Sequence, residues 1–175
     1  MLKKIALILT LVVFAGALSA CGPKSIEEVE GETYECSQFT ALCPKGWMNS
    51  PVKELNNDQV LSMNHLRFYK VEVEEGEELG SKLYSNAYVD IAHYPADSKI
   101  YESRDIYQNV EDVEFEISGK KWKGYTGELA GYKNGLVWID GTGEWQVSMC
   151  LSDEDGDVEF EDFDFQAILS SLKKK

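Results

Sequence analysis

Val113-Glu114-Phe115-Glu116-Ile117 alternates apolar and acidic side chains, and a second run of mixed polarity, 122–129, returns after Ser118-Gly119-Lys120. Strict alternation predicts a half-buried strand, and two such runs joined by a short step with glycine predict a β-hairpin. This part of the chain therefore indicates an antiparallel β-sheet as the basis of the fold.

The next part of the chain predicts a second hairpin. Segments 136–140 and 144–151 flank Gly141-Thr142-Gly143, and one face of the returning strand is apolar, with Trp145, Val147, Met149 and Leu151. That spacing places Trp145 in the core. Further strands are expected at 39–43, 66–71 and 86–94.

A C-terminal helix is expected near 162–173. Phe165, Ile168, Leu169 and Leu172 recur at helical spacing, and Asp162 or Asp164 could cap the start. Lys173-Lys174-Lys175 would then lie at the negative end of the helix dipole. The expected fold class is α+β, an antiparallel β-sheet with packed helices.

The N-terminal segment predicts export and lipidation. Lys3 and Lys4 precede an apolar run, and Leu18-Ser19-Ala20-Cys21 is similar to a bacterial lipobox. The run is shorter than the roughly 20 apolar residues that span a bilayer. We expect a lipoprotein signal peptide at 1–20, a lipidated tether at 21–33 and one globular domain at 34–175. The mature protein would be lipid-anchored at Cys21 on the extracytoplasmic face of the cell membrane.

Charge narrows the choice of partners. The chain has a formal net charge of −14, and removal of residues 1–20 with Lys3 and Lys4 makes it −16. A basic footprint for nucleic acid is absent, so nucleic acid is excluded as a partner. A cationic protein or peptide, or Ca²⁺, suits this surface, although acidity can also serve solubility alone.

An acidic run offers a weak candidate for Ca²⁺. Asp153, Asp155, Asp157 and Glu159 carry suitable oxygens, but the glycine and the final acid miss the register of an EF-hand loop. A solvated acidic turn is the alternative. His65 and His93 lack metal-ligand spacing, and no other cofactor is expected.

Cysteines and tyrosines supply the remaining candidates. Three cysteines follow Cys21, and strand parity favours a Cys36–Cys150 disulfide, with Cys43 as the alternative partner. The aromatic residues of this region could form a stacking platform for sugars or a peptide, but core packing is favoured for the cluster as a whole, which comprises Trp122, Tyr125, Tyr132, Trp138 and Trp145. Tyr125 and Tyr132 lie beside glycines and are the candidates for a surface aromatic pair.

Three motifs together resemble a known family. They are Phe39…Leu42-Cys43-Pro44-Lys45-Gly46-Trp47, then Gly119-Lys120-Lys121-Trp122-Lys123-Gly124-Tyr125, and the segment 161–172 with its Ile168-Leu169-Ser170-Ser171 core. This order is similar to the PsbP-like extracytoplasmic lipoproteins of Gram-positive bacteria. The resemblance implies a central antiparallel sheet covered by helices and a non-enzymatic role, since related photosystem and nuclear-transport proteins are binding factors. It carries no catalytic residues and no ligand.

The expected function is therefore a non-enzymatic binding or accessory domain held at the membrane. A cell-envelope hydrolase acting on glycan or peptide is the alternative. No nucleophile elbow, phosphate loop or dinucleotide fingerprint occurs in the chain. A general base in a deep pocket would favour the hydrolase, and a shallow acidic or aromatic face would favour the binding domain.

Overall fold

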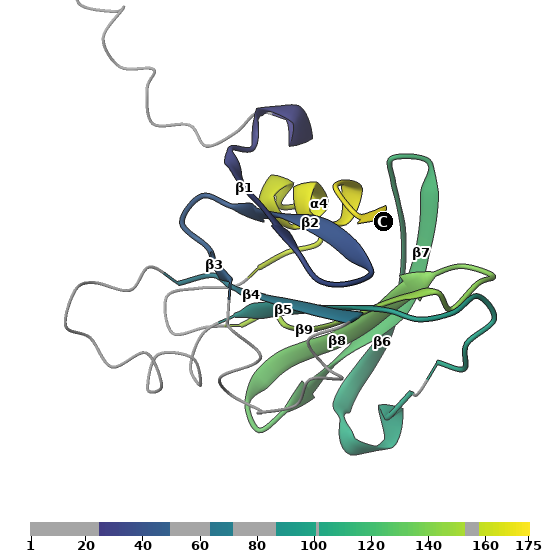
Figure 1. Cartoon of the computed structure of the whole chain (residues 1–175). Helices are drawn as coiled ribbons and strands as arrows, with labels where there is room; N and C mark the ends of the chain where they lie inside the picture. Colours follow the sequence, from purple (N-terminus) through teal and green to yellow (C-terminus); the bar gives the residue numbers. More distant parts are fainter. Residues whose placement is uncertain (1–24, 50–63, 72–86, 101, 153–157) are drawn as a thin grey trace, which may run out of the picture.

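A seven-stranded antiparallel sheet forms the larger layer of the fold. The computed structural model describes residues 25–49, 64–71, 87–100, 102–152 and 158–175 (Figure 1). The strand order is β3-β4-β5-β9-β8-β7-β6, with the bounds β3 Met48–Asn49, β4 His65–Tyr69, β5 Tyr88–His93, β6 Gln108–Ile117, β7 Lys120–Leu129, β8 Tyr132–Ile139 and β9 Trp145–Cys150. Both predicted hairpins are confirmed, β6–β7 and β8–β9.

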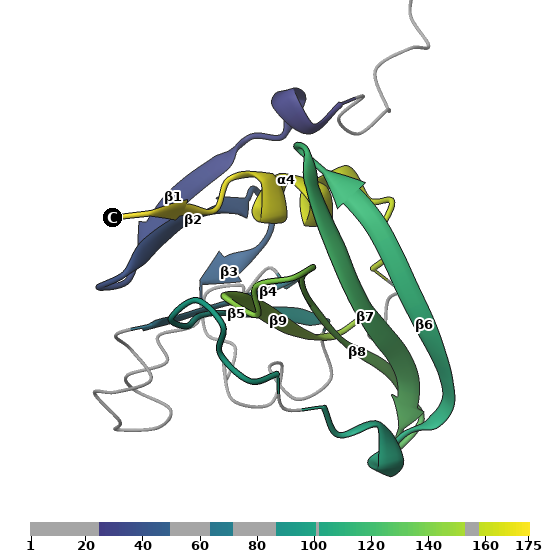
Figure 2. The same cartoon turned by 90° about the vertical axis from the view of Figure 1, so that its right-hand side faces the viewer.

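A smaller sheet and one α-helix form the second layer. The smaller sheet has the order β1-β2-β10, with β1 at Gly31–Glu35, β2 at Phe39–Pro44 and β10 at Lys173–Lys174. Helix α4, Phe163–Ser170, confirms the predicted C-terminal helix. Figures 1 and 2 show the smaller sheet and α4 above one face of the larger sheet, with the β6–β7 hairpin rising beside α4. Two short 3₁₀-helices complete the described elements, η1 at Ile26–Glu28 and η2 at Arg104–Ile106.

The core lies between the two layers. The smaller sheet contributes Phe39, Ala41 and Cys43, and the apolar face of β9 is buried as predicted. From α4, Phe165, Ile168 and Leu169 are fully buried. Removal of this apolar surface from water, at about 25 cal/mol per Å², holds the layers together. The fold is thus α+β and mostly β.

The folded part begins earlier than expected. Residues 26–33 were assigned to the tether, but η1 packs against α4 and β1 pairs with β2 from Gly31↔Pro44 to Glu35↔Thr40. Four of the five β1 residues are exposed, so this strand buries little side-chain surface and has no hydrophobic period. Backbone hydrogen bonds to β2 hold β1 in place, and such bonds leave no periodic pattern in the sequence.

The secondary structure of the C-terminal lysines also differs from the prediction. Lys173 and Lys174 do not extend the helix end but form β10, paired with Thr40 and Phe39 of β2. Lys174 forms an ion pair with Glu144, and Lys175 forms one with Glu35 at 2.8 Å. These contacts join the end of the chain to both sheets. None of the helices in the described part of the chain is long and apolar enough to cross a membrane.

Candidate functional site

An open groove of about 530 Å³ lies where β1 meets the turn between β2 and β3. Its polar walls come from Glu30, Glu32 and Lys45, and its apolar walls include Tyr34, Trp47 and the buried Cys43. The groove is formed by the edge of the smaller sheet and by the segment that leads from it to the larger sheet.

The local sequence explains how these side chains come together. Glu32 pairs with Cys43 and Tyr34 with Ala41, so both β1 side chains lie on the face that β2 turns toward the core. A Cβ atom on Gly31 would lie 2.2 Å from the carbonyl oxygen of Cys43, so glycine permits the close approach of β1 to β2.

The turn after β2 positions Trp47. Gly46 has φ +82°, which favours glycine, and the Trp47 amide donates to the Pro44 carbonyl at 3.0 Å. The indole Nε1 then donates to Oδ2 of Asp164 at 3.2 Å. Trp47 therefore joins the groove to the first turn of α4.

Electrostatics in the groove are set by Glu32. The Tyr34 hydroxyl donates to its carboxylate at 3.0 Å, and this bond raises the pKa of Tyr34. Burial and the Glu32 charge raise the pKa of the Cys43 thiol to about 12. Glu30 and Lys45 form an exposed ion pair at 3.4 Å. Two carboxylates and one ammonium leave the groove with an excess of negative charge, which suits a cationic group.

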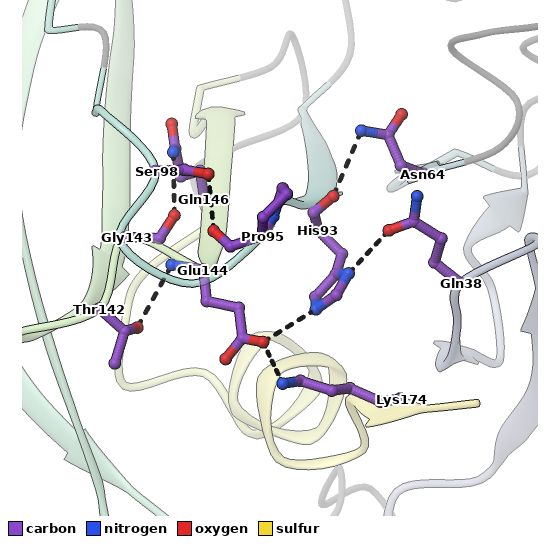
Figure 3. A network of polar contacts seen from close by, with 10 residues as sticks. All are labelled: Gln38, Asn64, His93, Pro95, Ser98, Thr142, Gly143, Glu144, Gln146 and Lys174. Atoms are coloured by element: carbon purple, nitrogen blue, oxygen red, sulfur yellow. Dashed lines mark hydrogen bonds and ion pairs between the residues drawn. The ribbon is translucent and has the colours of Figure 1, made fainter.

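A second polar cluster surrounds His93 (Figure 3). Its Nδ1 lies 2.8 Å from Oε1 of Gln38, and its Nε2 lies 3.3 Å from Oε1 of Glu144, which also pairs with Lys174. The ring packs on Trp145 with centroids 4.6 Å apart. Both ring nitrogens are thus engaged in contacts that connect β5 and β9 to the smaller sheet. We assign this cluster a structural role.

The outer face of the larger sheet carries a cross-strand ion pair. Arg67 of β4 lies opposite Asp90 of β5, and their side chains form a hydrogen-bonded ion pair. Arg67 also lies over the Tyr88 ring, 4.9 Å from its centroid. The Nε of Arg67 and the Oδ1 of Asp90 are buried and have no hydrogen-bond partner. The pair is therefore sensitive to loss of either member.

The predicted surface pair of tyrosines is wrong for one member. Tyr125 is only 2% exposed, because Arg104 lies 4.6 Å from its ring centroid and Tyr107 packs on it. Its hydroxyl also accepts a hydrogen bond from the Ser103 amide at 3.1 Å. Tyr132 is exposed as expected, at 38%. The segment between β5 and β6 covers Tyr125. The prediction of a surface position was based on the adjacent glycines, which do not indicate that another segment packs over the ring.

The predicted Cys36–Cys150 disulfide is absent. No disulfide joins Cys36, Cys43 and Cys150 in the described part of the chain. The Cys36 thiol points to the Phe39 carbonyl at 3.7 Å, whereas the Cys150 thiol points to the Ser152 carbonyl at 3.4 Å. Cys36 follows β1 in the smaller sheet and Cys150 ends β9 in the larger one. The prediction was based on the alternation of side chains along each strand. That alternation does not show that Cys36 and Cys150 belong to different sheets.

Two predicted sites fall partly or wholly outside the described residues. They are the lipidation site Cys21 and, in the acidic run, Asp153, Asp155 and Asp157. Glu159 is described, and its carboxylate pairs with Lys133 at 3.4 Å. Among the described residues, no group of three or more His, Cys, Asp or Glu side chains is arranged to hold a metal ion.

The groove itself was not predicted as a site. Pro44-Lys45-Gly46-Trp47 belongs to one of the three motifs singled out in the sequence, but the participation of β1 depends on a pairing that periodicity does not show. Comparisons with protein-family models, curated proteins and solved structures return no match for this chain.

Proposed function

We propose that this protein is an extracytoplasmic lipoprotein, anchored through Cys21, whose PsbP-like domain is a non-enzymatic binding or accessory module for a cationic partner. The observation that carries the proposal is the groove lined by Glu30, Glu32, Tyr34 and Trp47. Carboxylates attract a basic group, and aromatic rings add cation–π and apolar contact.

The position of the groove in the chain supports the same function. Because η1 begins at Ile26, five peptide steps separate it from Cys21, and they reach at most about 18 Å when extended. The groove uses Glu30 and β1, directly after η1. A lipid-anchored domain of this form would hold the groove close to the membrane surface, where a membrane protein or a peptide near the bilayer can reach it.

The anchor is tested by the variant Cys21→Ala. The protein should then appear in the medium or remain an uncleaved precursor. Normal processing with full retention at the membrane would contradict the anchor. A cell-envelope hydrolase remains the alternative, and turnover of peptidoglycan or of envelope peptides by the purified domain would favour it.

Binding is tested by capture from detergent-solubilised membranes with the lipidated protein as bait. The double variant Glu30→Gln/Glu32→Gln should lose the captured partner. The control Glu114→Gln/Glu116→Gln makes the same change in net charge at exposed positions of β6 and should retain it. Equal loss in both variants would assign the binding to overall charge, and equal retention would contradict a role for the groove.

A further inference from the structure

Strand β1 has a hydrogen-bonding edge that the rest of the described chain does not use. Within the described part of the chain, β1 pairs only with β2, as the first strand of the order β1-β2-β10. Gly31, Glu32, Thr33 and Glu35 are all exposed. An unpaired strand edge presents a row of backbone donors and acceptors that can pair with another chain.

The hydrogen bonds on either side of β2 show which β1 groups face outward. Lys45 N donates to Glu30 O at 2.8 Å and Cys36 N donates to Phe39 O at 3.0 Å, so the even-numbered residues of this segment bond to β2. Leu42, opposite Thr33, donates its amide away from β1, to Oγ of Ser171 at 2.8 Å. Antiparallel pairs alternate between bonded and non-bonded positions.

It follows that Gly31, Thr33 and Glu35 direct their N–H and C=O groups to the open edge. Residues two apart on a strand are separated by about 6.8 Å, which is the repeat that an added strand requires. The edge therefore offers three consecutive sites for backbone hydrogen bonds.

The other strand edges are less suited to such an addition. Strands β3 and β10 have two residues each. The edge strand β6 has ten residues, but its pairing with β7 shifts register between Gln108 and Glu111. A bulge is one of the features by which proteins protect long edges. None of these three strands lines the groove of β1.

The side chains of an added strand would reach the groove. Residues opposite Glu32 and Tyr34 point to the same sheet face as these side chains, and that face leads to Trp47. A basic side chain there meets the Glu32 carboxylate and the aromatic walls. Alternate positions of the added strand thus combine backbone pairing with charge recognition.

We propose that β1 accepts an extended segment of a partner protein, basic at alternate positions, as a fourth strand of the smaller sheet. This mode of recognition is β-strand addition, in which main-chain hydrogen bonds give affinity and alternate side chains give specificity. The inference rests on the proposed binding function and specifies its ligand. A second copy of the chain is a poorer occupant, because each β1 carries Glu32 and Glu35 and would oppose like charge.

A synthetic hexapeptide, Lys-Val-Arg-Val-Lys-Val, tests the inference with the isotope-labelled chain that begins at Cys21. Binding should slow amide hydrogen exchange at Gly31, Thr33 and Glu35 by about tenfold or more, as expected for donors that gain hydrogen bonds. The same peptide N-methylated at alternate residues on its pairing edge should bind about tenfold more weakly, since it retains charge but loses main-chain bonds. Glu32→Gln should weaken binding of the basic peptide, and the matched variant Glu114→Gln should not.

Equal affinity for the methylated and unmethylated peptides would overturn strand addition. So would unchanged exchange at the three outward amides. If the membrane capture described above still depends on Glu30 and Glu32, the binding function stands and only the mode of recognition fails. Dimerisation of the chain through β1 in the absence of peptide would instead identify a second copy as the occupant.

Discussion

The indole of Trp47 donates a hydrogen bond to the carboxylate of Asp164, 3.2 Å away and 117 residues later in the chain. Trp47 follows the turn after β2, and Asp164 lies in the first turn of α4. The bond thus fixes one wall of the groove to the helix that covers the core.

Replacement of Asp164 by alanine should loosen that wall. The variant loses one side-chain hydrogen bond and one acid near a helix N-terminus, so the free energy of unfolding should fall by about 1–2 kcal/mol. Asp164→Asn keeps an acceptor for the indole and should lose about half as much. Urea denaturation measures both values. Equal losses would mean that charge alone accounts for the role of Asp164.

Loss of Asp90 should cost more than loss of an ordinary surface acid. Asp90→Ala leaves the Arg67 guanidinium without its partner on a sheet face where its Nε is already buried and unbonded. We expect a loss of about 1–3 kcal/mol, below the cost at a fully buried pair because Arg67 is 30% exposed. The double variant Asp90→Ala/Arg67→Met should recover part of the loss. A double variant as unstable as the sum of the two singles would contradict this coupling.

Much of the larger sheet followed from sequence because its strands bury one face. The alternation around Phe115 and the apolar set with Trp145 and Met149 predicted both hairpins correctly. Burial on one face creates a period of two, and that period is visible without any structure. The C-terminal helix was predictable for the same reason, since α4 buries Phe165, Ile168 and Leu169.

The smaller sheet was harder to predict because backbone pairing, and not burial of one strand face, holds its edge strands. Glu32 and Thr33 are exposed strand residues that resemble a tether, and Lys174 resembles a helix end until its pairing with Phe39 is known. The groove depends on the β1 pairing, so it was missed with it. Tyr125 is covered by Arg104 and Tyr107, which lie in and directly after the short 3₁₀-helix η2 and give no periodic signal in the sequence.

The Cys43 thiol should make the free energy of unfolding fall as the pH rises into the alkaline range. Its pKa is raised to about 12 in the folded protein, above the value of about 8.5 for an exposed thiol. The folded state then holds a proton that the unfolded state releases, so the contribution is complete below about pH 8.5 and is lost as the pH rises toward 12.

The variant Cys43→Val removes the titrating group and keeps an apolar side chain. Between pH 8 and pH 10.5 wild type should lose about 2–3 kcal/mol more stability than the variant. Iodoacetamide should also label Cys43 slowly in the native protein at pH 8. Parallel stability curves for the two proteins, or rapid native labelling, would show that the thiol is not held protonated by the fold.

Glu144 should give an opposite dependence at acid pH. Its bonds to Lys174 and then His93 lower the pKa of this carboxyl group. The stabilisation is therefore present above the unfolded pKa of about 4.3 and is lost as the pH falls through the lower folded value. Because Lys174 is half exposed, the expected contribution is a few tenths to about 1 kcal/mol. Thermal unfolding from pH 6 to pH 3 measures it.

The loss of stability between pH 6 and pH 3 should be smaller in Glu144→Gln than in wild type. The matched variant Glu159→Gln removes an exposed ion pair with Lys133 that does not involve β10. Its loss of stability between pH 6 and pH 3 should be close to that of wild type. If Glu144→Gln loses as much stability at acid pH as wild type, this carboxylate is excluded as a source of acid sensitivity.

Site-specific photocrosslinking in cells tests the central claim, that the groove and open edge of β1 bind a basic segment of a partner at the membrane. A benzophenone side chain would replace Thr33 at the edge, and a control would carry it at Glu114 on β6, where the side chain is also exposed. The predicted result is a discrete adduct from position 33 that disappears in the Glu30→Gln/Glu32→Gln background, with no such adduct from position 114. Equal crosslinking from both positions, or an adduct at position 33 that survives loss of both carboxylates, would contradict the claim.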